Sequence, residues 1–519
     1  MRSSFLGLEV SKRSIQVSQK ALDITNNNLS NISTEGYTRQ RVDQNSTYLS
    51  VTGKYATKLS RLSLAGQGVN AFGVNQIRDS YVDKRYREFT AYVAEYDTKA
   101  SLTGEIEDIL SDISDTGLIS GLEDFKTALA SYAADHPDSG ELASVVRNNA
   151  YSICRMLNSY STELNNLLNE NIIQLQDSVS QVNNLIDKIV QYNKVIVGEY
   201  NITAADLIYN GETVAGSYGP NELLDARNLL LDELSYYGNV TVTDNDDGSV
   251  KVMMGDTVII DGSKSEHVIM KDYENYGAAV LRFTNGDSVE LESGDMKAYM
   301  DMLNGNGSYA NYYQSNEYGI PYYISTLDAF AQSFAQLMNE TNGCTDTDTS
   351  RAMFASNNDR YDAAGNLIKR EVITAATIRI SNEWMADAMM IGQTYNEETG
   401  IWDMTSLDGS NVNKLYLALD TDITVGRAKE FTGSIYDYCL FVDNRFAESI
   451  NYYNKQYELY SDNATSILDT RDSISAVSET EEGINMLTYQ KWYNASSRMM
   501  TTLDDCLDRL INSTGRVGL

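Results

Sequence analysis

The last stretch of the chain has apolar side chains that recur with a period close to 3.5 residues. Alternating steps of three and four from Met486 reach eight positions, of which seven are large apolar or aromatic residues. Such a repeat places one stripe along one side of a helix. Ser478 and Glu481 have capping-box spacing, which predicts where the helix begins. We call these eight positions the C-terminal seam: Met486, Tyr489, Tyr493, Ser496, Met500, Leu503, Leu507 and Leu510, with Ser496 as the polar exception.

The first stretch of the chain carries two sets of apolar residues, each with a spacing of seven. We therefore expect both chain ends to be amphipathic helices that pack against each other; the alternative is that each stripe is ordinary core of its own domain. Because both ends are rich in Asn, Ser and Thr, which are poor helix formers, we expect them to be disordered or frayed in the free monomer and to order beside neighbouring copies. The N-terminal seam is Leu8, Ile15, Leu22 and Leu29, and the second set is Val10, Val17 and Ile24.

Helical patterns continue inward from both ends. Helical periodicity runs from Ser80 to about Ala134, and residues 141–198 contain no proline and no glycine before Gly198, which predicts one very long helix. A phase shift of the apolar repeat near Gly483 predicts a joint between two helical segments. Further helices are predicted at 220–234, at 321–341 and from about Ser434 onward.

The middle of the chain has patterns typical of strands. Residues on both sides of Asp247-Gly248 alternate with period two, which predicts a β-hairpin, and strand-like pieces follow to about Leu291. Residues 345–425 form a second insert of mixed character. We expect that deleting this second insert would leave assembly of the protein largely intact.

These patterns predict a mainly α protein with β-rich inserts. We expect an elongated, multidomain molecule in which a long helical bundle or coiled coil extends from both chain ends and β domains lie in the middle. The predicted domains are a terminal helical domain (1–64 and 475–519), a long-helix bundle (65–235, 286–343 and 427–474), a β-hairpin insert (236–285) and an outer mixed or β insert (344–426).

Composition excludes several classes of function. The 519 residues carry 40 basic and 73 acidic side chains, a net charge of −33, which disfavours nucleic-acid binding because phosphates would be repelled. No window approaches 18 continuous apolar residues, so we expect no membrane insertion. The charged N-terminus predicts no cleavable signal peptide. The four cysteines lie far apart and are expected to be structural thiols.

Candidate chemistry is sparse. The segment DNDDGS at 244–249 resembles a calcium loop, but Thr243 and Met254 would occupy its first and twelfth positions, so a hairpin turn fits better. The two histidines, His136 and His267, belong to no zinc-protease motif, and we find no phosphate loop and no nucleophile elbow. We predict no catalytic residue, no metal, no cofactor and no enzymatic activity.

Four segments resemble flagellar axial proteins. NNLSNISTEGYTRQ at 27–40 is similar to their N-terminal motif, with matches at Asn28, Asn31, Thr34, Gly36, Tyr37 and Arg39. Three segments resemble the hook-associated protein 1 family (FlgK type) more specifically: GPNELLDARNLLLDEL at 219–234, the helix at 319–343, and the ending from Asn485 to Asn512, in which Tyr489, Gln490, Tyr493, Ala495 and Arg498 match.

This resemblance implies a secreted structural protein of the bacterial flagellum, exported unfolded by the type III route and placed where hook meets filament. It implies contacts with the hook protein, with the third hook-associated protein, with a flagellar export chaperone at the C-terminal helix, and with copies of itself. Asn31, Gly36, Tyr37 and both seams would then serve assembly. The alternatives are another flagellar axial protein, such as a hook protein or a flagellin-like protein, and an extracellular adhesin or binding module on a helical stalk.

Overall fold

The structure of the protein is a computed structural model. The chain divides into two compact units, of which unit 1 comprises Met1–Thr90, Val182–His267 and Ser461–Leu519, and unit 2 comprises Ala91–Gln181 and Val268–Tyr460. The structure describes residues 5–46, 68–110, 117–134, 138–206, 220–271, 277–345, 350–362, 367–396, 401–407, 409–426 and 430–512.

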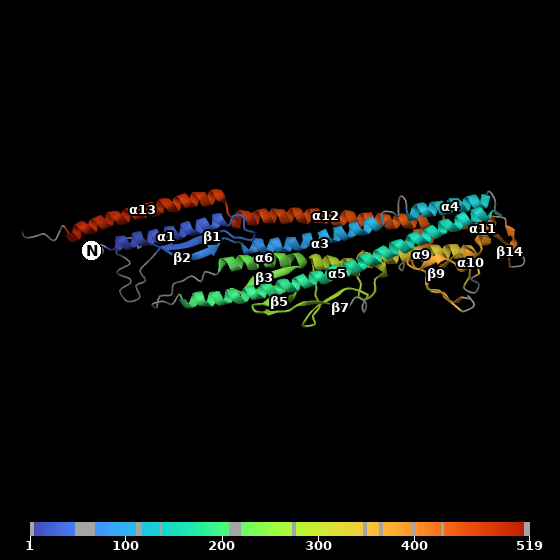
Figure 1. Ribbon diagram of the computed structural model, residues 1–519, viewed down its shortest axis with the longest axis horizontal. Coiled ribbons are helices and arrows are strands. Elements are labelled where there is room, and N and C mark those ends of the chain that lie inside the picture. Colours follow the sequence, from blue (N-terminus) through green and yellow to red (C-terminus); the bar gives the residue numbers. More distant parts are fainter. Residues whose placement is uncertain are drawn as a thin grey trace, which may run out of the picture. The chain divides into compact units, whose positions relative to one another are not determined.

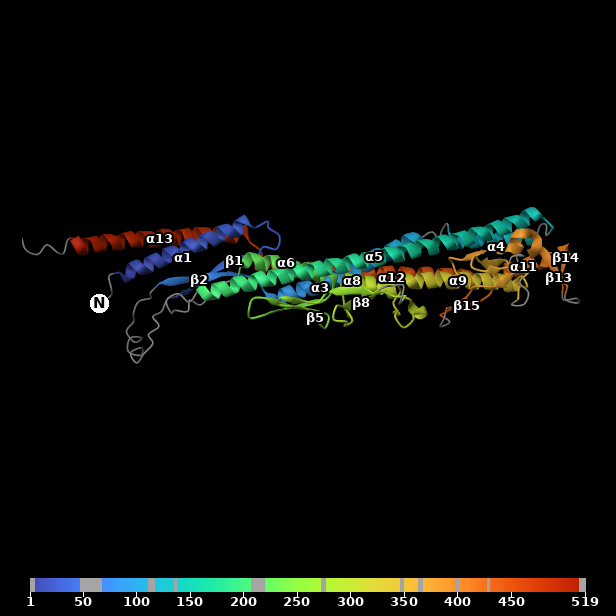
Figure 2. The same cartoon turned by 60° about the horizontal axis from the view of Figure 1, so that its bottom comes forward.

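Unit 1 contains both terminal helices. α1 (Leu6–Ser30) and α13 (Glu479–Asn512) lie side by side, as both views show (Figure 1, Figure 2). An antiparallel pair of strands, β1 (Gln40–Ser46) and β2 (Val69–Gln76), lies against α1. The unit also holds α6 (Asn221–Tyr237), the start of α3 (Ser80–Leu110), the last part of α5 (Gly140–Asp206) and the end of α12 (Ile435–Ser475).

A four-stranded antiparallel sheet follows α6 in unit 1. The predicted hairpin is confirmed: β3 and β4 pair from Val240↔Met254 onward, and Gly248 takes a φ of 83° in the turn. Asn193 of α5 is buried and fastens this hairpin, because its Nδ2 donates to the Val250 carbonyl (3.3 Å) and its Oδ1 accepts from the Val250 amide (3.2 Å). The strand order is β3 (Val240–Asp244), β4 (Val250–Met254), β5 (Thr257–Asp261), β6 (Lys264–Ser265).

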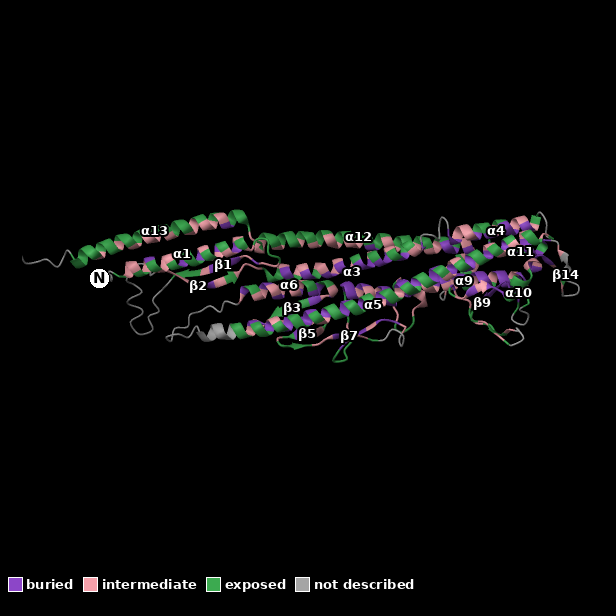
Figure 3. Cartoon of the chain, in the orientation of Figure 1, coloured by how far each residue is buried: buried purple, intermediate pink, exposed green. Residues whose placement is uncertain are grey.

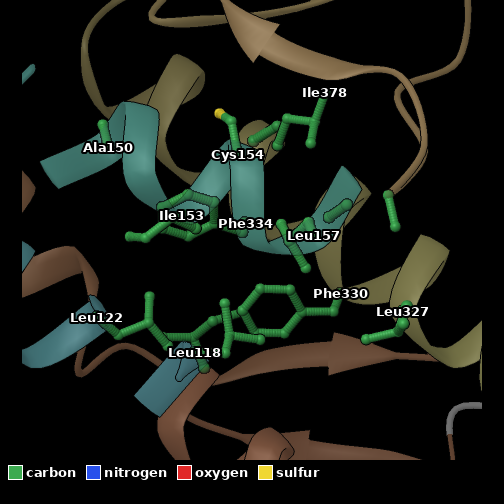
Figure 4. Packing of buried hydrophobic residues seen from close by; sticks show 14 of the residues in the cluster. Leu118, Leu122, Ala150, Ile153, Cys154, Leu157, Leu327, Phe330, Phe334 and Ile378 are labelled. Carbon is green, nitrogen blue, oxygen red and sulfur yellow. The ribbon is translucent and has the colours of Figure 1, made fainter. Parts of the chain in front are cut away.

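Unit 2 is organised around three packed helices. Leu118 and Leu122 of α4 (Leu118–Ala134) face Ile153 of α5 and Phe334 of α9 (Ile320–Thr341) in a fully buried cluster (Figure 4). Around it lie two-stranded antiparallel pairs and short helices. The remaining elements are β7 (Val268–Lys271), β8 (Val280–Phe283), α8 (Asp295–Asn304), η2 (Gly307–Tyr309), β9 (Phe354–Ser356), β10 (Arg360–Tyr361), β11 (Leu367–Lys369), β12 (Ile378–Ile380), α10 (Asn382–Ala386), η3 (Ala388–Gly392), β13 (Gln393–Asn396), β14 (Ile401–Leu407), α11 (Ser410–Ala418), β15 (Ile423–Val425) and β16 (Phe431–Gly433).

The mainly α architecture with a β-containing middle is confirmed, with two differences in detail. The stretch from Ser80 to Ala134, for which helical periodicity predicts helix without a break, contains two helices, α3 and α4. The predicted joint near the C-terminus exists, but it lies between Ser475 and Glu479 instead of at Gly483, because Ser478 caps α13. A glycine inside an exposed helix costs only about 1 kcal/mol, so Gly483 does not end it.

The predicted domain boundaries stay a prediction. The two compact units divide the chain elsewhere, with boundaries inside α3, α5 and α12, since each of these helices runs on from one unit into the other. Parts of the predicted terminal domain, at 1–4, 47–64 and 513–519, lie outside the described residues.

Candidate functional site

The two terminal helices run antiparallel, with α1 beside α13 in a fixed register. The Oγ atoms of Ser14 and Ser496 lie 2.7 Å apart. Two helical turns further along, Gly7 lies next to Leu503, where an added Cβ would come within 3.0 Å of Leu503 Cδ1. Ser496, the polar exception in the C-terminal seam, thus meets a polar partner, and Gly7 lets the two helices approach closely.

The structure places the two helices that carry the seams side by side without burying the seams. The four positions of the N-terminal seam are half-buried, and so are all positions of the C-terminal seam from Met486 to Leu507. Leu510, in contrast, stays 57% exposed. In α13 only Glu482 is buried, and Figure 3 shows this helix mostly exposed. Whether these positions serve assembly stays a prediction.

The second apolar set of α1 faces a different neighbour. Val17 is 6% exposed, whereas Val10 and Ile24 are half-buried. This side of α1 completes the contact with β1 and β2 that holds the helix in unit 1. Val10 lies next to Gly68, directly before β2, whereas Gly7 and Ser14 lie against α13, so α1 contacts the strand pair and α13 through different residues.

The turn after α1 is built by side-chain hydrogen bonds. Asn31 caps the helix, since its Nδ2 donates to the Asn27 carbonyl at 3.0 Å. Gly36 has a φ of 74°, which only glycine adopts easily. The Tyr37 hydroxyl donates to Asn28 Oδ1 at 2.9 Å, and burial followed by the nearby Asp225 raises the pKa of Tyr37 to about 12, so the phenol stays a neutral donor.

Asn28 links this turn to β1. It is 1% exposed; its Nδ2 donates to the Gln40 carbonyl at 2.9 Å, and its Oδ1 accepts from the Gln40 amide at 3.0 Å. The next residues reach two distant segments. The Thr38 amide donates to Asp225 Oδ2 (3.2 Å), and the Arg39 amide donates to the Ser475 carbonyl (2.8 Å).

Arg39 ties the N-terminal turn to the start of α13. Its Nε donates to Glu482 Oε1 at 2.7 Å and its NH1 donates to Glu481 Oε2 at 2.6 Å. The Glu482 side chain is 3% exposed, whereas that of Glu481 is 61% exposed. The pair with Glu482 is therefore shielded from solvent, and it fixes where α13 leaves α12.

A network of buried ion pairs lies close by in unit 1. Arg471 of α12 contacts Asp83 (Nε to Oδ1, 3.2 Å) and Asp232 (NH2 to Oδ2, 2.7 Å). Arg87 shares Asp232 at 2.7 Å, and Arg78 shares Asp83 at 2.5 Å. Burial alone would lower the pKa of Arg471, but Asp232 and Asp83 outweigh it and raise the pKa. The network thus joins α3, α6 and α12.

Sequence reasoning singled out the seams and missed these charged residues as site members. Arg39 and Glu482 lie 443 positions apart, and no local pattern connects them. Two weak signals were present: Arg39 is in the N-terminal motif, and Glu481 and Glu482 are in the first turn of a predicted helix, where acids favour the helix dipole.

Besides its contact with α1, α13 leaves several large apolar side chains exposed. We call Ile484, Leu487, Trp492 and Met499 the outer stripe; their side chains are 51% to 60% exposed. Exposed apolar side chains that form a contiguous patch mark interaction sites. That the outer stripe makes a further contact beyond the pairing of α13 with α1 stays a prediction.

The described residues contain no group of acidic, histidine or cysteine side chains that could hold a metal ion. No helix in the described part of the chain has the length and apolar character to cross a membrane. His267 lies 3.0 Å (Nε2) from Asp187 Oδ1, and His136 lies outside the described residues.

Known proteins resemble this chain in both sequence and fold. The flagellar hook-associated protein FlgK helical domain matches residues 103–354, and the flagellar basal body rod FlgEFG protein C-terminal segment matches residues 471–513. Flagellar hook-associated protein 1 of Bacillus subtilis is 29% identical over 538 residues, 99% of both chains, and that of Escherichia coli is 20% identical over 568 residues, 96% of this chain and 98% of its own. The fold is similar to the flagellar hook junction protein FlgK from Burkholderia pseudomallei, with a TM-score of 0.53, 12% identity, and coverage of 76% of this chain and 100% of that one.

Proposed function

Because this chain belongs to the flagellar hook-associated protein 1 (FlgK) family, we propose that it is a structural subunit of the junction between flagellar hook and filament, where it serves flagellum assembly and motility. The observation that carries this proposal is the antiparallel pair of α1 and α13 with its exposed outer stripe. A soluble subunit with such a stripe gains stability when another copy covers it.

The pair alone buries little apolar surface. Its seam positions are half-buried, and the buried residues of α1 are mostly polar: Ser11, Val17, Ser18, Ala21, Thr25 and Asn28. Burial of a large apolar side chain contributes about 2 kcal/mol, and half-burial correspondingly less. We infer that the α1–α13 pair is only marginally stable in an isolated subunit. It gains stability when the outer stripes and seams of several copies pack together in a ring or helical layer.

The partners follow the same reasoning. We propose that the assembled terminal helices stack on the hook protein at one end and on the third hook-associated protein at the other. Before export, a flagellar chaperone would cover the C-terminal seam and the outer stripe of α13, which would otherwise be exposed on an unassembled chain. Export by the flagellar type III route completes the proposed placement in the extracellular flagellum.

We propose a structural role without catalysis. The named relatives are hook-associated proteins, and the site described above consists of helix seams and ion pairs that hold elements in place.

Charge placed on the outer stripe tests the proposal. Trp492→Glu combined with Met499→Glu should abolish attachment of filaments to hooks, because two carboxylates would enter a subunit contact, while the α1–α13 pair and unit 2 stay folded. The measurement is swimming motility, with electron microscopy of hook ends, in a flagellated host that lacks its own copy of this protein.

The matched control adds the same two charges to exposed polar positions of α13. Gln490→Glu combined with Asn494→Glu should leave filament attachment and motility unchanged. Normal junctions with the outer-stripe variant would refute assembly through this face, and loss of junctions with both variants would show sensitivity to charge rather than to the stripe.

A further inference from the structure

Unit 1 contains a polar cleft with an unusual share of basic side chains for a chain of net charge −33. The cleft has a volume of about 480 Å³. Its walls are the start of α3, the first turn of α6, the end of β3 and the turn that leads to β4. Four basic residues line it: Arg78, Lys84, Arg87 and Arg227.

Two of these four residues have carboxylate partners inside the protein. Arg78 pairs with Asp83 and Arg87 pairs with Asp232, each at 2.7 Å or less. Lys84 is exposed and, within the described part of the chain, forms no ion pair. The cleft therefore has positive charge beyond what its own acids neutralise.

Arg227 is the least compensated of the four. It is only 3% exposed, and its NH1 donates to two neutral oxygens, Asn193 Oδ1 (3.1 Å) and the Gly248 carbonyl (2.7 Å). Its Nε is buried with no hydrogen-bond partner, and no carboxylate among the described residues forms an ion pair with it. Burial lowers the pKa of Arg227 to about 10, with Asp244 opposing the change, so the guanidinium is still charged at neutral pH.

A buried cation without an ion pair is costly, by several kcal/mol for a group this well shielded, and Asp244, which also lines the cleft, acts on Arg227 without forming an ion pair with it. One account of Arg227 is purely structural, because its NH1 bonds hold α5 and the β3–β4 turn together. That account does not explain why a charged side chain, whose buried Nε has no hydrogen-bond partner, lines an open cleft. The first turn of α6, with Asn221 and Leu224 in the wall, adds the positive end of a helix dipole.

We propose that this cleft binds a small oxyanion, a carboxylate or a phosphate-like group, held by Arg227 from the buried side and by Lys84 from the rim. A planar guanidinium forms strong, charge-assisted bonds to such groups, and the ammonium adds a point charge. The carboxylate could belong to an acidic side chain of another protein, whereas phosphate would be a free ion. The proposal is independent of the assembly role proposed above.

Calorimetric titration of the full chain with inorganic phosphate tests the site, with sodium chloride at matched ionic strength as the blank. Lys84→Gln should weaken phosphate binding about tenfold, the effect of losing one charge-assisted hydrogen bond. Lys84 is exposed, so this variant should fold as the wild type does. Lys188→Gln, which removes an exposed lysine of α5 outside the cleft, should bind as the wild type does.

A second arm of the titration distinguishes the two sources of the anion. Acetate binding as tight as phosphate binding would support a site for a protein carboxylate, and preference for phosphate would support a site for the free ion. Arg227→Lys keeps the charge but loses the planar guanidinium group. The folded variant should therefore bind both phosphate and acetate more weakly than the wild type. No saturable heat with either anion, or equal binding by the Lys84→Gln and wild-type chains, would overturn the proposal.

Discussion

At the scale of single residues, buried polar side chains decide how the two chain ends meet. The Asn28 side chain forms hydrogen bonds to both the carbonyl and the amide of Gln40, as a neighbouring strand would. Arg39 forms an ion pair with Glu482, near the other end of the chain. Each contact satisfies a group that would otherwise be buried without a partner, which costs about 1–3 kcal/mol for a neutral group and more for a charge. The helices supply apolar area, but these side chains set the register.

Arg39→Gln should lower the free energy of unfolding of unit 1 by about 3 kcal/mol, because it leaves the Glu482 carboxylate buried without its cation. Denaturation in urea, followed by circular dichroism, measures the change. Arg41→Gln is the matched control, since Arg41 pairs with Asp43 at the surface and its side chain is 65% exposed; it should change stability by less than about 1 kcal/mol. Equal effects of the two substitutions would contradict the importance of the buried pair.

Asp295 gives unit 2 a defined pH dependence. It is 5% exposed and accepts hydrogen bonds from Thr98 (2.8 Å) and Ser178 (2.7 Å), and burial raises the pKa of its carboxyl. A raised folded-state pKa means that the protonated acid is favoured in the fold, so its stabilising contribution is lost as pH rises through that pKa.

Asp295→Asn should therefore raise the stability of unit 2 at pH 7, and this gain should shrink as pH falls through the raised pKa, below which the wild-type carboxyl is protonated too. Urea denaturation of both proteins across this pH range measures the difference. Asp422→Asn, at an exposed position of unit 2, is the matched control for the change of side chain. A stability gain that grows as pH falls would contradict a raised pKa of Asp295 in the folded protein.

At the scale of elements, the apolar repeat was enough to find both terminal helices and their pairing, while the start of α13 was predicted by the capping-box spacing of Ser478 and Glu481. The repeat shows which residues share a face; caps determine where a helix starts, and the Ser478 hydroxyl accepts from the Glu481 amide at 3.4 Å. Ser496 looked like a defect in the seam until its partner Ser14 was seen. Partners from the other end of the chain are invisible to local patterns, so the ion pairs could not be predicted.

Leu503→Asp combined with Leu507→Asp should separate α13 from α1, because both side chains are half-buried in the C-terminal seam and a charge there would be desolvated. Junction assembly and binding of the export chaperone should be lost, while unit 2 keeps its stability. Limited proteolysis should then release α13 first. Thr501→Asp combined with Thr502→Asp, at two exposed neighbouring positions, is the control. Filament attachment by the seam variant would contradict a role of the C-terminal seam in assembly.

At the scale of the whole molecule, the 344–426 insert belongs to the core of unit 2. Trp384 is fully buried and its ring lies 5.9 Å from that of Phe354, which in turn lies 5.0 Å from Phe334 of α9. Asn158 of α5 donates to the Ala375 carbonyl at 2.7 Å. The sequence suggested a separable insert because its strands are short and its pattern is mixed; what it packs against was not visible there.

Because the insert packs into this core, we no longer expect assembly to stay largely intact after deletion of residues 345–425. Deletion should unfold unit 2, because it uncovers the apolar faces of α4, α5 and α9. A milder change makes the same point: Trp384→Ala should cost about 3–5 kcal/mol, whereas Met385→Ala, at a neighbour that is 52% exposed, should cost little. Differential scanning calorimetry distinguishes them, and equal melting temperatures would refute a shared core.

Of the four cysteines, only Cys506 on α13 is exposed, so a probe can be attached to this helix without introducing a new cysteine. Burial raises the pKa of Cys154 and Cys439 to about 12, and Cys344 is buried as well, so maleimide dyes should ignore all three. Cys506 is exposed, seven residues beyond Met499 and hence two helical turns along the same side. A maleimide fluorophore should label Cys506 in every unassembled chain. Labelling of Cys506 should stop once chains have assembled into junctions, because the thiol is then covered.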